Sequence, residues 1–459
     1  MRFGPHVTTL RAARSRPARA RPCGTVVEAK GAVLLPISRR QALLLGLAGA
    51  TGGLAGCAAR EQATAESSQT RLLYWSGGLS SDVLDRAKNR FADRTELTPV
   101  QVEGVYRDQL TEILNSGRDL PGIVGIKGEE VAALVPRADL FVDLHTLGVD
   151  DLMSQYVPWK WQQAASPDNR QIGFPIDIGP TATFFRTDLF AAAGLPSDPA
   201  KVAASVRTWA DYIAGGVKLV KALPSVKLVR NSSELYTIML WQGTQRYIDE
   251  TNHYIGGEAH VKRAWDFSVQ LIEKDLVARI PGTDGDGWTK ALVEGTVATA
   301  LGASWLGYDL KSLAPDSSGK WRVASGPAIG ANYGGSFLAV PQGSADHALS
   351  FEIIKWILDP ENQAIAFTEA GLFPAATAAF EMPALAEPDP FFGGQKTIGI
   401  FADSARKAHR VYEAPADAKI HDAFVAQLDA IEKGAKPAAQ AWTDAVEEGR
   451  SIGASLGVN

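Results

Sequence analysis

The stretch that decides the fold is residues 71–91, RLLYWSGGLSSDVLDRAKNRF. It is apolar up to Trp75 and continues as Ser-Gly-Gly, which predicts a short strand ended by a turn. Ser80 or Ser81 can then accept hydrogen bonds from the first free N–H groups of a helix. The apolar positions that share one face of this helix are Val83, Leu84, Ala87 and Phe91.

The alternation of strand and helix continues along the chain. Residues 97–102 and 122–126 are apolar and predict a second and a third strand, with a helix between them that ends at Gly117. Single helices between successive strands indicate βαβ units and a mostly parallel sheet.

A second α/β block follows residue 172. It opens with an extended crossing segment, 172–186, and a helix at 188–193 that ends at Gly194. Further helices are expected at 209–214, 234–241, 261–274, 288–292, 304–313, 348–358, 360–370 and 420–433, and strands at 297–301 and 336–340. The fold class is therefore α/β.

The N-terminal part predicts export and lipid attachment. Ser38-Arg39-Arg40 is followed by an apolar run, 42–54, and by Leu-Ala-Gly before Cys57. Such a run is shorter than the about 20 residues that span a bilayer, so it is typical of a signal peptide with a lipobox. The alternatives are an uncleaved anchor or a buried apolar hairpin. We expect cleavage before Cys57, lipid on its thiol, and a protein held at the outer face of the cytoplasmic membrane.

Two further expectations concern the segments beside the signal. Residues 1–37 are rich in Arg and Pro without apolar periodicity, and an overcalled start near Val26, Val27 or Val33 is one explanation. Residues 58–70 are small and polar, which predicts a flexible tether. The paired arginines favour the twin-arginine export route. Gln41 stands where a typical twin-arginine signal has other residues, so the general export route stays open.

Charge and cysteine content narrow the function classes. Without residues 1–56 the chain keeps 37 basic and 50 acidic residues, a net charge of −13, which argues against a nucleic-acid partner. Cys23 and Cys57 are the two cysteines, so the mature fold has no disulfide and no thiolate metal site. No cofactor is expected.

Enzyme signatures are mostly absent, and aromatic residues stand out instead. The nearest match to a nucleophile elbow begins with Tyr74 instead of glycine. Asp284-Gly-Asp286-Gly resembles the start of a calcium loop, but Trp288 replaces the next oxygen ligand. Several tryptophans lie where strands end or glycines gather, which is typical of sugar sites that combine aromatic faces with polar groups. A core position is the alternative for each, and we assign Trp209, Trp265 and Trp356 to the core.

Seven segments carry a family resemblance over residues 71–450. The first, 173–190, reads GFPIDIGPTATFFRTDLF and is followed by AGLP at 193–196. The others are 295–306 (GTVATALGASWL), 333–341 (YGGSFLAVP), 351–358, 359–363 (DPENQ), 371–374 (GLFP) and 391–395 (FFGGQ). In order and spacing they resemble the sugar-binding proteins of carbohydrate ABC importers, the family 1 extracellular solute-binding proteins similar to maltose-binding protein.

The resemblance implies two α/β lobes with sugar enclosed between them, in the type II periplasmic-binding-protein fold. We expect residues 71–178 with 302–333 in the first lobe, and 179–301 with 334–459 in the second. Crossings are then expected near 178–182, 302 and 334–336. The implied partners are a carbohydrate and the membrane subunits of an ABC permease, and we expect a monomer that is not an enzyme.

Site residues follow from the same resemblance. Trp305 matches a stacking tryptophan, and Asp177 an acid that faces the cleft, although a turn cap would also explain Asp177. In the first-lobe loop this chain has Pro121-Gly122 where the family commonly has Pro-Asp. Of the adjacent Glu129 and Glu130, one is expected to face the cleft. The full set implied for sugar binding is Trp75, Lys127, Glu129, Asp177, Glu234, Tyr236, Trp305, Tyr333, Phe392 and Gln395.

Two other functions stay open from the sequence. An exported polysaccharide-active enzyme would need paired carboxylates, and no pair stands out. A binder of another solute, such as a peptide, an amino-acid derivative or a polyol phosphate, would share the fold. A phosphate ligand would call for cations near the site, where Lys127 and Arg186 qualify.

Overall fold

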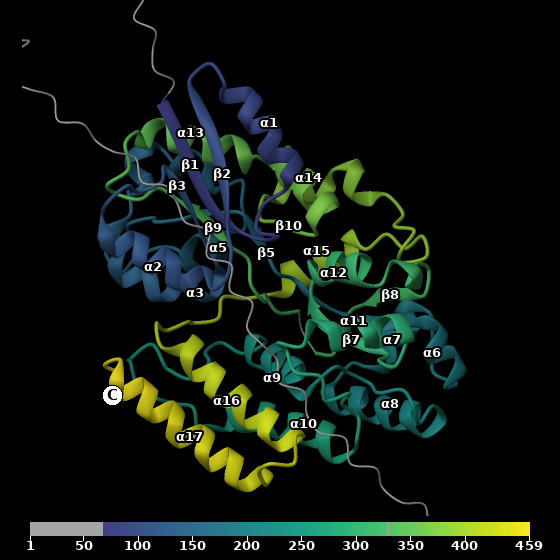
Figure 1. Cartoon of the computed structure of the whole chain (residues 1–459). Coiled ribbons are helices and arrows are strands. Elements are labelled where there is room, and N and C mark those ends of the chain that lie inside the picture. Colours follow the sequence, from purple (N-terminus) through teal and green to yellow (C-terminus); the bar gives the residue numbers. More distant parts are fainter. Residues whose placement is uncertain (1–67, 329) are drawn as a thin grey trace, which may run out of the picture. The chain divides into compact units, whose positions relative to one another are not determined.

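The computed structural model describes residues 68–328 and 330–459 (Figure 1). The predicted export signal, the arginine-rich segment 1–37 and the lipidation site Cys57 lie outside the described residues. The first part of the chain contains β1 (Ser68–Trp75), α1 (Ser81–Phe91), β2 (Thr95–Val102), α2 (Tyr106–Ser116), β3 (Ile123–Ile126), α3 (Gly128–Leu134), η1 (Val135–Leu140), η2 (Leu144–Leu147), α4 (Asp150–Met153), α5 (Pro158–Gln163) and β4 (Phe174–Pro175).

The first sheet has five strands in the order β2-β1-β3-β9-β4, where β9 is Phe337–Ala339. β1 is parallel to β2 and β3, as predicted, but β9 is antiparallel to both of its neighbours. Local sequence sets the helix ends here: the Ser80 hydroxyl accepts from the Val83 N–H at 3.1 Å, and α2 ends at Gly117 in the left-handed region. The expected tether reached Thr70, whereas β1 already begins at Ser68.

The second part of the chain builds a separate sheet. It contains β5 (Asp177–Ile178), β6 (Thr181–Arg186), α6 (Thr187–Ala192), α7 (Pro199–Ser205), α8 (Trp209–Ala222), α9 (Ser232–Trp241), α10 (Ala259–Glu273), α11 (Gly285–Glu294), β7 (Thr299–Ala303), α12 (Leu306–Leu313), η3 (Pro315–Ser317) and β8 (Trp321–Ala324). The sheet order is β7-β6-β8 and both pairings are antiparallel. The sequence predicts a mostly parallel sheet for the first block, but that sheet has two parallel and two antiparallel pairings.

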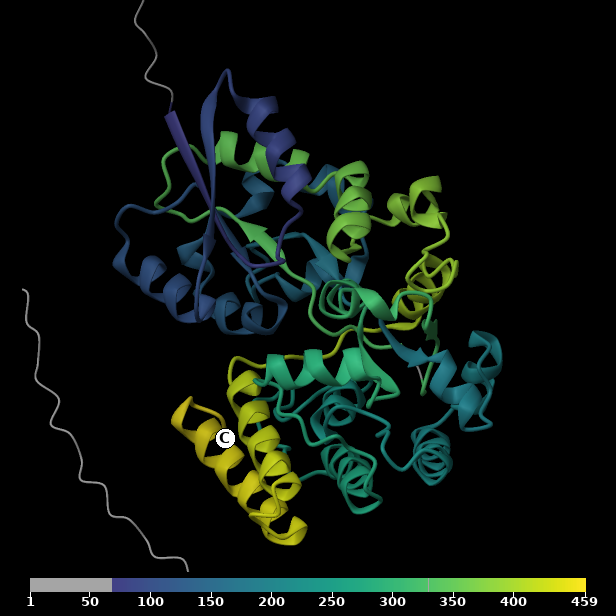
Figure 2. The same cartoon turned by 45° about the vertical axis from the view of Figure 1, so that its right-hand side comes forward.

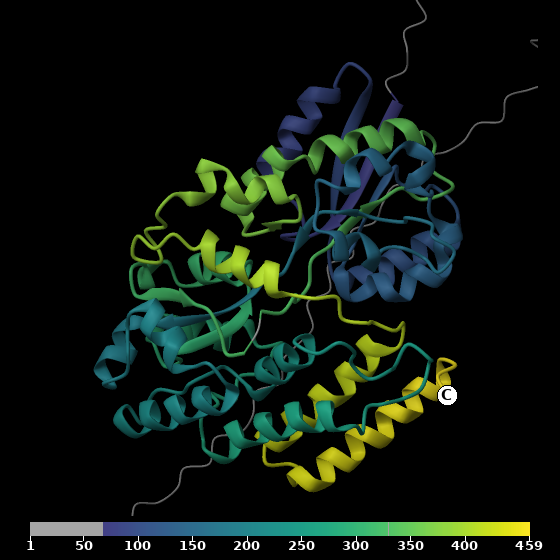
Figure 3. The ribbon, with the colours of Figure 1, turned by 180° about the vertical axis from the view of Figure 1, so that it is seen from behind.

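The last part of the chain is mainly helical. It contains α13 (His347–Ile357), α14 (Pro360–Ala370), β10 (Phe373–Pro374), η4 (Thr377–Glu381), η5 (Pro383–Ala386), α15 (Ile398–Lys407), α16 (Asp417–Glu432) and α17 (Ala438–Ser455). Helices α13 and α14 pack against α1, and Figure 2 shows the green α13 beside it. Helices α16 and α17 run along each other near α9 and α10, the yellow and teal elements of Figure 3.

The chain passes between the sheets along paired segments. Residues 176–181 run beside 331–336, with hydrogen bonds from the Thr181 N–H to the Ala331 carbonyl (3.0 Å) and from the Tyr333 N–H to the Gly179 carbonyl (2.8 Å). Segment 331–336 brings the chain back to the first sheet. Strand β8, which precedes this segment, pairs with β6, and β9, which follows it, pairs with β3. The sequence predicts residues 302–333, which include β8, in the first lobe and β9 in the second. The structure shows the reverse, since β8 pairs with β6 and β9 pairs with β3. The reason is that the chain does not cross at Gly302, because β7 continues directly into α12.

Candidate functional site

A cavity of about 690 Å³ lies between the elements of the two sheets. Six aromatic rings line it, from Trp75, Trp241, Trp305, Tyr308, Tyr333 and His421. Its charged lining comes from Arg107, Lys127, Glu129, Asp177, Arg246, Asp309, Glu413 and Asp422. Six of the ten residues implied for sugar binding are among them: Trp75, Lys127, Glu129, Asp177, Trp305 and Tyr333.

Trp75 is held at the end of β1 by its glycine neighbours. A Cβ on Gly78 or on Gly125 would lie 2.6 Å from the indole, so side chains at these positions would displace the ring. The Tyr106 ring meets the indole edge-on with 5.2 Å between centroids. On another side the Lys127 Nζ lies 5.5 Å from the ring centroid. The ring is therefore fixed between close contacts while it still lines the cavity.

The start of α3 separates two adjacent glutamates. Glu129 is exposed and lines the cavity. Glu130 is buried, with its Oε1 3.6 Å from the Arg107 Nε. Burial, reinforced by the charge of Glu129, raises the pKa of Glu130 to about 7, although Lys127 and Arg107 oppose the shift. Of the two candidates, Glu129 is the one at the cavity.

Asp177 lies at the crossing between the sheets and is buried. Its Oδ1 accepts from the Ser336 N–H at 2.7 Å, which fastens the two crossing segments to each other; this is a long-range bond and not the local turn cap of the alternative. Asp177 also lines the cavity. Lys160 lies behind it, with its Nζ 2.9 Å from the Gln163 Oε1 and 4.0 Å from the Phe337 ring centroid. Burial raises the pKa of Asp177, and the nearby ammonium of Lys160 opposes that rise.

The first turn of α12 supplies a second wall. Trp305 precedes this helix, and its ring centroid lies 5.8 Å from that of Tyr333. Asp309 follows four residues later on the same face of the helix. Burial raises the pKa of Asp309 to about 6, and no charge or hydrogen bond in the described part of the chain offsets that rise. The site thus has an aromatic face and a carboxylate acceptor one helical turn apart.

A cation held by carboxylates forms a further side of the cavity. The Arg246 Nη2 is 2.7 Å from Glu413, its Nε is 3.7 Å from Asp417, and its guanidinium lies 4.4 Å from the Trp241 ring centroid. The Gln163 Nε2 donates to Glu413 at 3.2 Å, which links α5 to the segment before α16. The charge of Arg246 is therefore matched inside the protein.

His421 is a neutral member of the lining. Burial and the charge of Arg246 lower its pKa to about 3. Its Nδ1 is 2.8 Å from the Tyr247 hydroxyl and its Nε2 3.1 Å from the Thr237 hydroxyl, so both ring nitrogens have partners. It contributes a ring face to the cavity.

Four residues of the implied set lie outside this cavity. Tyr236 has no exposed surface, and its hydroxyl accepts from that of Tyr247. Glu234 lies at the start of α9, where its Oε2 accepts from the Leu301 N–H at 3.5 Å. Gln395 bonds the backbone of Val323 through both its amide oxygen and nitrogen. Phe392 lines a different pocket.

The sequence reasoning missed nine charged, amide or aromatic residues of the lining. Tyr308 and Asp309 could have been found, because they lie three and four residues after Trp305 on a predicted helix. The others come from distant segments and have no local signal: Arg107, Gln163, Trp241, Arg246, Glu413, His421 and Asp422.

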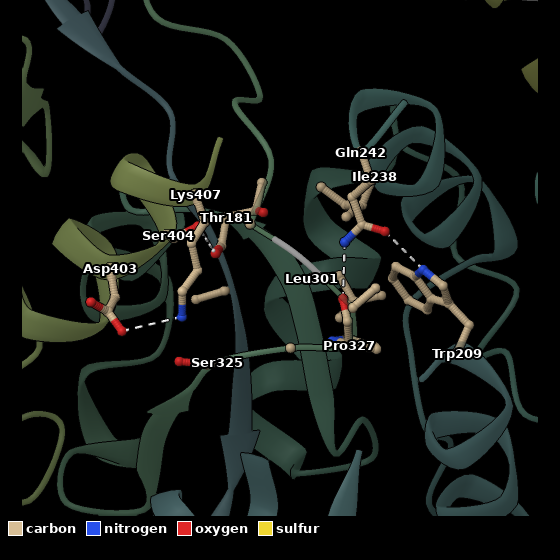
Figure 4. A pocket seen from close by; sticks show the side chains of 14 residues that line it. Thr181, Trp209, Ile238, Gln242, Leu301, Ser325, Pro327, Asp403, Ser404 and Lys407 are labelled. Carbon is tan, nitrogen blue, oxygen red and sulfur yellow. Dashed lines mark hydrogen bonds and ion pairs between the residues drawn. The ribbon is translucent and has the colours of Figure 1, made fainter. Parts of the chain in front are cut away.

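A second, much smaller cavity of about 50 Å³ lies under the loop at Pro327 (Figure 4). Its polar groups bond to one another: the Trp209 Nε1 donates to Gln242, and the Gln242 Nε2 donates to the Pro327 carbonyl, both at 2.9 Å. Such a volume holds a few waters and no sugar ring. Asp284 is also accounted for locally, since its carboxylate caps α11 by accepting from the Gly287 N–H at 2.8 Å.

Across 68–328 and 330–459, no three His, Cys, Asp or Glu side chains gather as metal ligands would. Within the same residues no helix has the length and apolarity needed to cross a membrane.

Comparisons with known proteins agree with this architecture. The family model of the bacterial extracellular solute-binding proteins matches residues 88–392. A lactose-binding protein of Rhizobium radiobacter is 30% identical over 275 residues, which cover 57% of this chain and 63% of that protein. A crystal structure of an extracellular solute-binding protein of family 1 superposes with a TM-score of 0.77 at 30% identity, over 84% of this chain and 100% of that one.

A more distant structure shares the fold. The ABC-transporter-associated binding protein of B. animalis subsp. lactis Bl-04, solved with β-1,6-galactobiose, has a TM-score of 0.70 at 22% identity. That match covers 85% of this chain and 99% of the other. The predicted two-lobed binding-protein fold is thereby confirmed, and the chain belongs to the bacterial extracellular solute-binding protein family.

Proposed function

We propose that this protein is the lipid-anchored solute-binding component of an ABC importer, and that it captures a disaccharide or oligosaccharide between its lobes. The observation that carries the proposal is the pairing of Trp305 with Asp309 on one turn of α12, in a cavity that Trp75 also lines. A pyranose ring offers a flat C–H face to an aromatic side chain and hydroxyl groups to a carboxylate. This pair meets both needs.

The charges of the cavity favour a neutral ligand over an anionic one. Five carboxylates and three cations line it. Two of those cations already lie close to carboxylates, Arg246 beside Glu413 and Arg107 beside Glu130. A phosphate or uronate would have to compete with these acids, whereas sugar hydroxyls can donate to them.

Size and relatives support the same ligand class. The volume of about 690 Å³ falls within the roughly 300–1,000 Å³ of pockets that enclose a small ligand. Among the matched proteins, one is a lactose-binding protein and another was solved with β-1,6-galactobiose. Both names refer to disaccharides.

The mechanism is capture by closure without chemistry. Because residues of both lobes line the cavity, a bound sugar contacts both and stabilises the form in which they are closest. Micromolar affinity corresponds to about −8 kcal/mol after the ordering costs are subtracted. Stacked rings at about 0.5–1.5 kcal/mol each, together with hydrogen bonds to charged groups, suffice for that value.

Delivery completes the function. Export, cleavage before Cys57 and lipid on its thiol would hold the protein at the outer face of the cytoplasmic membrane. There the closed form would dock on the membrane subunits of a permease. A monomer is sufficient, because one chain provides the whole cavity.

The test is calorimetric titration of protein lacking residues 1–57 with lactose, β-1,6-galactobiose, maltose, an amino-acid mixture and a sugar phosphate. We expect micromolar binding of one disaccharide class. We expect Trp305→Ala to weaken it by about tenfold or more, because the stacking face is lost.

The matched control is Trp159→Ala. Trp159 is also partly buried, but it lines a separate groove beside Phe380, so its loss should leave the affinity unchanged. Binding of amino acids or phosphates in place of every sugar would contradict the proposal. Equal affinities of the Trp305→Ala and wild-type proteins would remove the stacking argument.

A further inference from the structure

A third pocket, of about 270 Å³, lies beside the main cavity, between α12, α14 and the chain from η5 to the start of α15. Its floor contains Phe367, which is partly exposed, and Phe392 and Phe401, which are 3% and 2% exposed. Phe392 is one of the residues that sequence reasoning had connected with the ligand. The volume is just below the roughly 300 Å³ at which pockets enclose a whole small ligand, so it suits one part of a larger molecule.

The loop that carries Phe392 is built rigidly. The Gln395 side chain exchanges two hydrogen bonds with the Val323 backbone, at 2.9 and 2.7 Å, which ties the loop to the edge strand β8. Within the loop the Gly394 N–H donates to the Asp389 carbonyl at 2.8 Å. The Phe392 ring is therefore held in place before any ligand arrives.

The rim of the pocket offers both a donor and an acceptor. The Lys311 Nζ lies 2.6 Å from the Asp389 Oδ2 and 5.6 Å from the Phe392 ring centroid. Both side chains are partly exposed, at 39% and 21%. An aromatic floor with a charged pair at its edge is the same combination that suits a pyranose unit in the main cavity.

Tyr308 joins the two spaces, because its side chain lines both the main cavity and the pocket. Its side chain is exposed, with 45% of the residue's surface accessible. Behind it the chain is tight: a Cβ on Gly371 would lie 3.0 Å from the Trp305 Cα and 3.2 Å from the Tyr308 Cβ. Helix α12 lies between the two spaces: Trp305 and Asp309 line the main cavity, Gly307 and Lys311 line the pocket, and Tyr308 borders both.

We propose that this pocket is an extension of the binding site, which receives a further sugar unit of a ligand whose first units occupy the main cavity. The chain of the ligand passes over Tyr308 and places its next ring against Phe367, the partly exposed ring of the floor, beside Lys311 and Asp389. The ligand is then an oligosaccharide of at least three units. This inference rests on the proposed function and adds the length of the ligand to it.

The experiment compares disaccharides with trisaccharides. Lactose, β-1,6-galactobiose and maltose are each titrated beside trisaccharides that extend them by one hexose at either end. The wild type should bind one trisaccharide about tenfold more tightly than its parent disaccharide, because one further ring is stacked. Ala384→Trp, which places a large side chain at an exposed position of the pocket wall, should abolish that gain and leave the disaccharide affinity unchanged.

Controls separate a blocked pocket from a damaged fold. Ala384→Ser keeps the pocket open and should bind both ligands as the wild type does. Glu387→Trp blocks the same pocket from another exposed position and should repeat the effect of Ala384→Trp.

Three results would overturn the inference. If disaccharides bind and no trisaccharide binds more tightly, the extension is wrong and the proposed function stands. If the trisaccharide gain survives in both tryptophan variants, the extra unit lies elsewhere. If no sugar of either length binds, the proposed function fails and the extension fails with it.

Discussion

Asp309 is the residue whose ionisation should govern ligand affinity. Burial raises its pKa to about 6, so it is a carboxylate at pH 8 and becomes protonated as the pH falls through 6. The carboxylate is the stronger acceptor for sugar hydroxyls, by about 1 kcal/mol or about fivefold in affinity. We therefore expect the dissociation constant to rise about fivefold between pH 8 and pH 5, as measured by calorimetry.

Asp309→Asn should remove this pH dependence, since the amide does not titrate. It should bind at pH 8 about as weakly as the wild type does at pH 5. Asp316→Asn is the control, because Asp316 is exposed on η3 and does not line the cavity. If Asp309→Asn keeps the full pH dependence, another acid is responsible, and Asp177, whose pKa burial also raises, is the next candidate.

The sequence predicted the cavity residues unevenly, and the reason is physical. Trp75 ends a strand, and Lys127 and Trp305 come one and two residues after strands, where the motif order sets the position of the side chain. Tyr236 fails because α9 is apolar nearly all round, so spacing alone cannot say which face is covered. Arg246 and His421 are brought in by tertiary packing, which leaves no mark on neighbouring residues.

At the scale of elements, the crossing segments depend on one close approach. A Cβ on Gly179 would lie 1.8 Å from the Tyr333 carbonyl oxygen, which is backbone and cannot rotate away. We expect Gly179→Ala to lower the free energy of unfolding by about 1–3 kcal/mol, because the two strands must move apart. Sugar affinity should fall as well, since Tyr333 lines the cavity. Urea unfolding and calorimetry measure the two effects.

Gly215→Ala provides the matched control. Gly215 lies inside α8, where an added Cβ would meet nothing within 4 Å. Alanine there should raise the free energy of unfolding by up to about 1 kcal/mol through helix propensity and leave ligand binding unchanged. A Gly179→Ala protein as stable as the wild type would show that the crossing segments are not constrained as the structure indicates.

The elements themselves were largely predictable, but their pairing was not. Strands β1 to β3 and helix α14 follow from periodicity, caps and glycine stops. The antiparallel position of β9 between β3 and β4 comes from a return of the chain more than 150 residues later, which no local pattern encodes. The same long-range return reversed the expected sheets of β8 and β9.

At the scale of the whole molecule, the cavity and the lobes form one binding device. The link from Gln163 to Glu413 and the shared backbone bonds of 176–181 with 331–336 join the lobes at one side of the cavity. The pocket beyond Tyr308 adjoins the main cavity, so one ligand can reach both. Capture and length selection can therefore occur in one chain.

The proposed lipid attachment at Cys57 gives the last prediction. Expressed with its full sequence, the protein should sediment with membranes, because two or more acyl chains on one thiol give stable attachment. Cys57→Ser should be found in the soluble exported fraction with unchanged sugar affinity, since the cavity residues all come after Ser68. Cys23→Ser should remain with the membranes, as that cysteine precedes the predicted signal. Membrane sedimentation of Cys57→Ser would instead indicate an uncleaved apolar anchor, and a soluble wild type would rule out both forms of attachment.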